Sequence, residues 1–243
     1  MKIIPVIDVL NAIAVHGIRG ERKRYQPLKS SLCTSASPID IALTFESLGF
    51  DSLYLADLDS ILGKSTNFNI FREIMTKTSL DLMVDAGIAD LNKAQQVMET
   101  GVSKIVVGSE TLSSLDFVRQ AVNAFGENKV VVSIDQKRGK VLGASKAIAS
   151  MDTASFAQKL ANLGVRQIIL LDLDRVGTEH GINLTALRNI PEKTGVEVLV
   201  GGGIRSLHEL EELRSLEVSG ALVATVLHNG KVTVDELKSA SFL

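Results

Sequence analysis

Tryptophan is absent from the 243-residue sequence, which also contains only one cysteine and four prolines. The lone cysteine, Cys33, excludes an intramolecular disulfide and any metal site built on cysteine spacing. No apolar run approaches the roughly 18 residues of a membrane-spanning helix. The opening stretch "MKIIPVIDVL" is typical of a strand and not of a signal peptide. Since no low-complexity segment marks a linker either, we expect one domain over residues 1–243.

The chain also lacks an excess of charge of either sign, because its net charge is −2. Such a chain exerts no general attraction on nucleic acid or on membrane surfaces. A content of 45% hydrophobic and 22% charged residues is ordinary for a soluble globular protein. We therefore expect a cytoplasmic protein with neither nucleic acid nor a membrane among its partners, and the sequence leaves the oligomeric state open.

Eight short apolar runs, rich in β-branched residues, alternate with helical patterns. Runs that are apolar throughout favour a parallel sheet covered on both faces. Eight alternating units in a chain of this length predict a (β/α)₈ TIM barrel in preference to an open sheet. The runs cover residues 3–7, 52–57, 80–84, 104–108, 129–134, 167–172, 197–200 and 220–224.

An internal repeat strengthens this prediction. "IIPVID" corresponds to "VVVSID", "LYLADLD" to "IILLDLD", and "LMVDAGI" to "VLVGGGI", at a nearly constant offset. Two half-barrels, of about residues 1–122 and 123–243, would close into one barrel. An open sheet would not predict this doubling.

Polar residues at the carboxyl ends of barrel strands are the candidates for chemistry. Asp8 and Asp135 follow the first and fifth apolar runs and correspond to each other in the repeat. Two carboxylates that face each other across a cavity suit a general acid and a general base. The alternative for each aspartate is that it caps the next turn or pairs with a basic residue of a loop.

The segment "VGGGIRS" is the second candidate. Its glycines allow a backbone to turn tightly and to bring N–H groups close to a ligand. A helix start capped by Ser206 adds partial positive charge for an anion. This loop and the loop after the eighth strand, "VATVLHNG", form the usual phosphate site of such barrels. The alternative is a tight turn without a ligand.

The matching loop in the first half is unsuited to phosphate. Asp85 stands where Gly201 stands in the second half, and Glu110 stands in place of Val226. A carboxylate would repel a phosphate dianion at contact distance, and Ala89 replaces the arginine that Arg205 provides. This half-site would hold an ammonium or hydroxyl group, or it would be structural, with Asp85 capping its helix.

Other polar residues offer weaker candidates. The paired "DLD" motifs after the second and sixth strands either anchor loops or contact a ligand, and the long basic loop after the first strand is either solvated or a lid. The possible substrate contacts in these segments are Arg19, Asp174, Arg175, Thr178 and His180.

Taken together, "IIPVID", "ADLD", "VVVSID", "LDLDRVGT" and "VLVGGGIRS" resemble the histidine-biosynthesis barrel family across essentially the whole chain. That family includes a HisA-type isomerase and a HisF-type cyclase. The isomerase is the more similar of the two, because the cyclase pattern usually has a lysine where this chain reads "IAVHG".

The resemblance implies an Amadori rearrangement of an aminoaldose to an aminoketose, without a metal or an organic cofactor. It implies that Asp135 is the general acid that opens the ribose ring and that Asp8 is the base that removes the C2 proton. It also implies that one substrate phosphate is held by Gly202, Gly203, Arg205, Ala224 and Thr225.

Three departures from the family pattern are expected to alter the substrate. Val176 replaces the aspartate of the family's "DGT", the first glycine loop contains Asp85, and the tryptophan after the fifth strand is missing. The sequence therefore predicts a divergent paralogue that acts on a phosphorylated but altered substrate. The alternatives are the authentic histidine-pathway isomerase and a phosphosugar-binding protein without catalysis.

Overall fold

The protein forms a closed barrel of eight parallel strands, so the predicted fold is confirmed. The computed structural model describes residues 1–184, 187, 190 and 194–243. Each strand pairs with the next along the chain, and the eighth closes the ring by pairing with the first, with Ile4 opposite Leu222. The strands are β1 (Lys2–Leu10), β4 (Ser52–Asp57), β5 (Asp81–Asp85), β6 (Lys104–Gly108), β7 (Val130–Lys137), β9 (Gln167–Asp172), β10 (Glu197–Gly201) and β11 (Gly220–Val223).

Alternation along each strand creates two apolar layers. Side chains such as Ile4, Met83 and Leu199 fill the interior of the barrel. Their neighbours, such as Ile7 and Val84, point outward and pack beneath the helices. Burial on both faces explains why the strands read as continuous apolar runs in the sequence.

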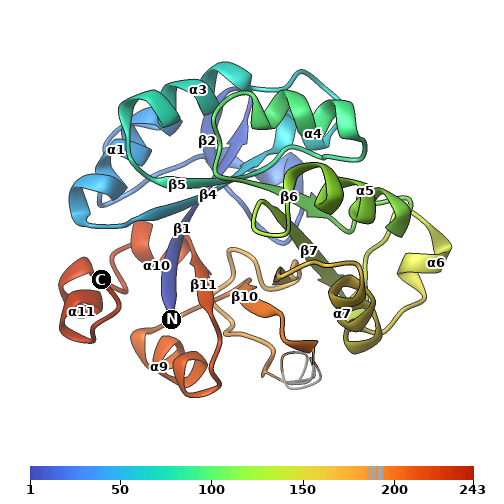
Figure 1. Ribbon diagram of the computed structural model, residues 1–243. Helices are drawn as coiled ribbons and strands as arrows, with labels where there is room; N and C mark the ends of the chain where they lie inside the picture. The colour runs from blue at the N-terminus through green and yellow to red at the C-terminus, as the bar shows by residue number, and fades with distance from the viewer. Residues whose placement is uncertain (185–186, 188–189, 191–193) are drawn as a thin grey trace.

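Helices surround the barrel, as Figure 1 shows. The longer ones are α1 (Pro38–Leu48), α3 (Phe68–Lys77), α4 (Leu91–Met98), α5 (Leu115–Phe125), α7 (Thr153–Asn162), α9 (Leu207–Ser215) and α11 (Val234–Ser239). The short ones are η1 (Arg22–Arg24), α2 (Leu58–Ile61), α6 (Lys146–Ala149) and α10 (Thr225–His228). Within the described ranges, no helix has the length and apolar character to cross a membrane.

In the sequence, the spacings of Ser206 with Glu209 and of Thr233 with Glu236 predict two capping boxes, and one of them forms differently. Thr233 and Glu236 bond reciprocally at the start of α11, as predicted. Ser206 accepts a hydrogen bond from Glu209 N at the start of α9, but the Glu209 carboxylate does not return to Ser206. It accepts instead from Arg205 N at 3.0 Å and from Ile182 N at 2.7 Å. Glu209 thus ties α9 to a distant loop.

Asp8 and Asp135 lie within strands and not at strand ends, which corrects the sequence prediction. β1 continues to Leu10 and folds back as β2 (Ile13–His16), which pairs in turn with β3 (Gln26–Pro27). β7 continues to Lys137 and pairs with β8 (Lys140–Val141). In both halves a hairpin extends the strand beyond the barrel rim, so each aspartate sits at the rim with backbone partners on both sides.

Candidate active site

A cavity of about 460 Å³ opens at the carboxyl ends of the strands. This is a usual size for a small-molecule site. Seven of the predicted site residues line it: Asp8, Asp85, Asp135, Gly202, Gly203, Ala224 and Thr225. Six others do not: Arg19, Asp174, Arg175, Thr178, His180 and Arg205. The cavity therefore brings together both strand aspartates and both glycine-loop positions.

Asp135 is held in place by hydrogen bonds to its own strand and to the residues that follow β6. Its Oδ1 accepts from Ser133 Oγ at 2.6 Å, and its Oδ2 accepts from Glu110 N at 3.4 Å. Ser109 Oγ accepts from the backbone N–H of Asp135 at 3.0 Å, which fixes β6 against β7. Burial raises the pKa of Asp135 to about 7, although the Ser133 hydrogen bond favours the charged form.

Asp8 faces Asp135 from the first strand, four strands away around the ring. The Asp8 carboxylate makes no hydrogen bond to any described residue, and it keeps a partly accessible surface toward the cavity. Burial within the barrel rim raises the pKa of Asp8 to about 6, and the nearby charge of Arg22 partly opposes that rise. Asp8 is thus the more acidic of the two strand aspartates.

Asp85 is a third buried carboxylate, with 8% of its surface exposed. Its Oδ1 accepts from Gly87 N at 3.0 Å, which closes a tight turn after β5. The alternative that Asp85 caps the next helix is wrong, because Asp90 caps α4 by accepting from Lys93 N. The pKa of Asp85 is raised to about 8, mainly by burial, with a contribution from the charges of Asp135 and Glu110, and the Gly87 hydrogen bond opposes this rise.

The basic segment between β2 and β3 lines the cavity and is anchored to the opposite wall. Arg22, in η1, forms an ion pair with Glu110 at 2.7 Å, and both side chains are a little over one-quarter exposed. Tyr25 follows η1 and also lines the cavity. Arg22 thus links this segment to the acidic end of the cavity.

The opposite end of the cavity is formed by the glycine loop after β10 and by the start of α10. Thr225 Oγ1 lies 3.3 Å from His16 Nε2, and burial lowers the pKa of His16. Glu179 also lines this end, but its carboxylate is engaged by Asn229 Nδ2 at 2.6 Å and by Lys231 Nζ. This end therefore presents backbone, hydroxyl and imidazole groups.

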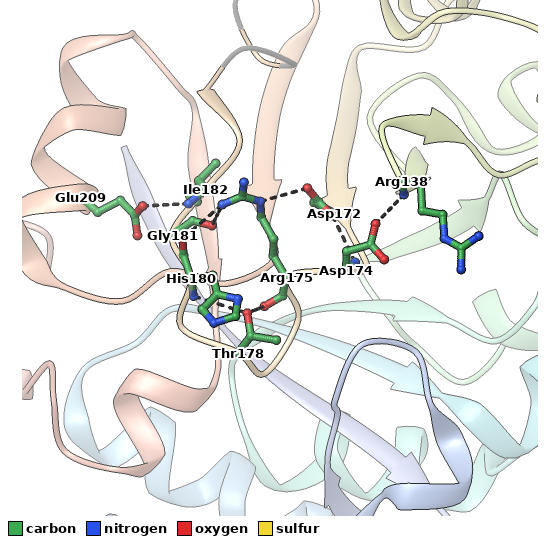
Figure 2. A network of polar contacts seen from close by, with 9 residues as sticks. All are labelled: Arg138, Asp172, Asp174, Arg175, Thr178, His180, Gly181, Ile182 and Glu209. Atoms are coloured by element: carbon green, nitrogen blue, oxygen red, sulfur yellow. Dashed lines mark hydrogen bonds and ion pairs between the residues drawn. The ribbon is translucent and has the colours of Figure 1, made fainter.

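The predicted contacts in the loop after β9 form a network behind the glycine loop (Figure 2). Arg175 pairs with Asp172 at 3.3 Å and donates to the carbonyl of Gly181 at 2.8 Å. Thr178 Oγ1 donates to Arg175 O at 2.7 Å, and Asp174 accepts from the backbone N–H of Arg138. These side chains hold the loop and do not point into the cavity.

Three further predicted contacts lie outside the cavity. His180 is exposed, and its backbone N–H donates to Thr178 Oγ1 at 3.3 Å. The Arg205 side chain is 58% exposed and lies 3.9 Å from Glu209. Arg19 is exposed, and its backbone N–H donates to Val176 O at 2.9 Å. In this structure each of them contributes to loop geometry.

Tyr54 and His16 are among the lining residues that were not predicted as site residues. Tyr54 lies inside the barrel with 5% of its surface exposed, and burial followed by the charges of Asp85 and Asp135 raises its pKa well above 10. His16 stands in β2, beside Thr225. A polar group in the middle of the run "SLYLAD" was a usable signal for Tyr54, whereas nothing in the sequence indicated that β2 folds back over the barrel mouth.

A closed (β/α)₈ barrel with a carboxylate-lined cavity at the carboxyl ends of its strands has the architecture of barrel enzymes. The family model described as "Histidine biosynthesis protein" matches residues 2–233. The chain belongs to this family, as its sequence motifs predicted.

Relatives match over nearly their full lengths. An uncharacterized protein from Methanocaldococcus jannaschii is 34% identical over 240 residues, which cover 98% of this chain and 97% of that one. A 1-(5-phosphoribosyl)-5-((5-phosphoribosylamino)methylideneamino)imidazole-4-carboxamide isomerase from Streptococcus thermophilus is 31% identical over 242 residues, 98% of this chain and 99% of its own. An isomerase of the same name from Lachnoclostridium phytofermentans is 28% identical over 245 residues, 100% and 99% of the two chains.

Proposed function

We propose that this protein is an aldose–ketose isomerase of the HisA type that rearranges an N-substituted aminoaldose phosphate to the aminoketose. The observation that carries this proposal is the pair of Asp8 and Asp135 in one cavity, with the pKa of Asp8 raised to about 6 and that of Asp135 to about 7. A base must be ionised and an acid must be protonated near neutral pH, and this order of pKa values suits those two roles.

In the proposed reaction, Asp135 gives a proton to the ring oxygen of the sugar, and the C1–O bond breaks to leave an iminium group. Asp8 then removes the proton from C2, so that the electron pair of that C–H bond moves toward the iminium nitrogen. Protonation at C1 and loss of the proton on the C2 hydroxyl give the ketone. The reaction is intramolecular and returns every proton, so this pair of carboxyl groups suffices for the proton transfers.

One end of the proposed substrate is a phosphate held at the glycine loop. Gly202 and Gly203 supply backbone, Thr225 supplies a hydroxyl, and Ala224 precedes the first turn of α10. The position after the seventh and eighth barrel strands is the usual phosphate site of this fold. Arg205 is not part of the proposed site, because its side chain lies outside the cavity beside Glu209.

The other end of the substrate is proposed to differ from that of the named isomerases. The name of those isomerases describes a substrate with two phosphoribosyl groups. Here Asp85, Glu110 and Asp135 line the end where a second phosphate would lie. An ionised carboxylate at contact distance from a phosphate dianion repels it by several kcal/mol, and a bound dianion would force all three groups to stay protonated, so we propose a substrate with one phosphate.

Two experiments test the proposal. The purified protein in deuterated water should convert N-alkyl ribosylamine 5-phosphates to ketoses with deuterium at C1, and Asp8→Asn should slow this conversion about 10²–10⁴-fold. Conversion that is absent, or that survives in Asp8→Asn, would refute the isomerase and favour a binding protein.

The second experiment is expression in a strain that lacks the histidine-pathway isomerase. Restored growth at normal expression would favour the authentic activity, which the named relatives support.

A further inference from the structure

The cavity end formed by β4, β5, β6 and β7 gathers three carboxyl groups. Asp85, Glu110 and Asp135 line it from three consecutive barrel strands or the loops that follow them. Within the described residues, Arg22 is the one cation that forms an ion pair with any of the three. Arg22 balances Glu110, and a cation bound beside Asp85 would favour the ionised form of that carboxyl group, against the burial that raises its pKa to about 8.

Two of these carboxylates meet across β6. A Cβ built on Gly108 would lie 3.2 Å from Asp85 Oδ2 and 3.4 Å from Asp135 Oδ2. Both oxygens therefore border the same small space above the glycine, and a side chain at position 108 would fill it. Asp85 Oδ2 forms no hydrogen bond to any residue that the structure describes, since only Oδ1 is engaged by Gly87 N. One acceptor of a buried carboxylate thus faces the cavity without a partner.

Tyr54 adds a further polar group to this end. The residue lies inside the barrel with 5% exposure. It stands two residues before Ala56 on the same face of β4, and Ala56 pairs with Asp85. Its hydroxyl makes no hydrogen bond in the described part of the chain, although the side chain lines the cavity. The hydroxyl thus opens onto the cavity, where it can accept a hydrogen bond from a bound group.

We propose that this end of the cavity binds a protonated amino group of the ligand, with Asp85, Glu110 and the Tyr54 hydroxyl as its acceptors. An ammonium carries three donors and no acceptor, which matches a cluster of carboxylate and phenol oxygens. No group of three or more His, Cys, Asp or Glu side chains among the described residues converges as metal ligands do. The acceptors are spread around a space that suits an organic cation. This inference rests on the proposed function only in placing a phosphate at the far end.

The probes for this proposal are three matched series of graded chain length: ω-aminoalkyl monophosphates, ω-hydroxyalkyl monophosphates and alkane bisphosphates. Their binding is measured by isothermal titration calorimetry. The amino compound of the best length should bind about tenfold or more tightly than its hydroxy counterpart, which is the effect of one charge-assisted hydrogen bond. Equal binding of the amino and hydroxy compounds, or tighter binding of the bisphosphate, would overturn the proposal.

Variants of the lining residues test whether a preference for the amino compounds arises at this end of the cavity. Asp85→Asn should remove the preference for the amine, whereas Asp81→Asn should keep it, because Asp81 is exposed at the other end of the same strand. Glu110→Gln removes an acceptor and releases Arg22, so it should weaken amine binding and strengthen bisphosphate binding. A preference that survives in both Asp85→Asn and Glu110→Gln would place the amine elsewhere and refute the proposed site.

The same titrations separate this inference from the proposed function. If phosphorylated probes bind without any preference for the amine, the ammonium site is refuted and the phosphate end stands. If unphosphorylated ω-amino alcohols bind as tightly as the amino phosphates and Asp85→Asn weakens both, the ammonium site is supported and the phosphate is refuted. Thermal unfolding of each variant shows whether it is folded under the conditions of the titration.

Discussion

Three carboxyl groups in one cavity have different pKa values, and their surroundings explain the differences. Asp8 has Arg22 near it and a pKa of about 6, Asp135 has hydrogen-bond donors and Glu110 near it and a pKa of about 7, and Asp85 has a pKa of about 8. Burial is the largest cause in each case, and neighbouring charges separate the values. Because its pKa is the lowest of the three, Asp8 is the most ionised at neutral pH and is the group available to act as a base.

A pH–rate profile checks this assignment. The reaction needs Asp8 ionised as the base and Asp135 protonated as the acid. The value of kcat/KM should therefore rise as Asp8 loses its proton at about pH 6 and fall as Asp135 loses its proton at about pH 7. The expected result is a narrow bell, measured on whichever ribosylamine phosphate is converted. A rate that climbs steadily through about pH 8 would contradict the protonated role of Asp135.

Asp85 should make the protein less stable as the pH rises. Its pKa is about 8 in the folded state and near 3.8 when unfolded, so the folded state binds this proton more tightly. The stability that Asp85 contributes is complete below about pH 4 and is lost as the pH approaches about 8, where a charge must be buried. Asp85→Asn never ionises, and its side-chain oxygen still accepts from Gly87 N.

Urea unfolding measures this effect. The free energy of unfolding of Asp85→Asn should exceed that of the wild type by about 2 kcal/mol at about pH 9, and this difference should shrink toward about pH 5. Asp81→Asn, an exposed change on the same strand, is the control and should show no such trend. A destabilised Asp85→Asn at about pH 9 would mean that the ionised carboxylate has a partner in the folded protein.

At the scale of elements, the loop after β10 depends on the loop after β9. Gly203 has a φ of +88°, and a Cβ there would lie 2.9 Å from both Arg175 Cβ and Arg175 O. The network in Figure 2 fixes that neighbouring loop, because Arg175 binds the carbonyls of His180 and Gly181 at 3.1 and 2.8 Å. The glycine loop is thus shaped by residues that do not reach the cavity themselves.

Gly203→Ala should therefore disturb both loops. Gly63→Ala is a matched control, since Gly63 also has a positive φ of +74° but open space around its Cβ position. Gly203→Ala should lower the free energy of unfolding by about 2 kcal/mol more than Gly63→Ala does, and it should weaken the binding of inorganic phosphate. Equal losses in the two variants would show that the close approach to Arg175 relaxes without cost.

The sequence predicted the elements well where the signal was local. Every predicted barrel strand formed close to its expected bounds, because buried parallel strands are short runs of apolar residues. The capping box at Thr233 is equally local, since both partners lie within one helical turn. Glu209 was misassigned because its partner Ile182 lies far away in sequence, and capping patterns contain no information about such contacts.

At the scale of the whole molecule, the internal repeat was the most useful signal for the site. It placed Asp8 opposite Asp135 and identified Asp85 as the change that distinguishes the two halves. The same repeat could not predict that hairpins extend β1 and β7, or that the loop after β1 carries Arg22 onto Glu110. Those features depend on which loops meet above the closed ring, and only the folded barrel brings them together.

The barrel thus has two unlike ends to its cavity, and a crystal structure of the protein soaked in phosphate tests this asymmetry most directly. The expected result is an anion at Gly202, Gly203 and Thr225, and no anion at the end lined by Asp85 and Glu110. An anion beside Asp85 would contradict the assignment of that end to a cation, and with it the proposed substrate.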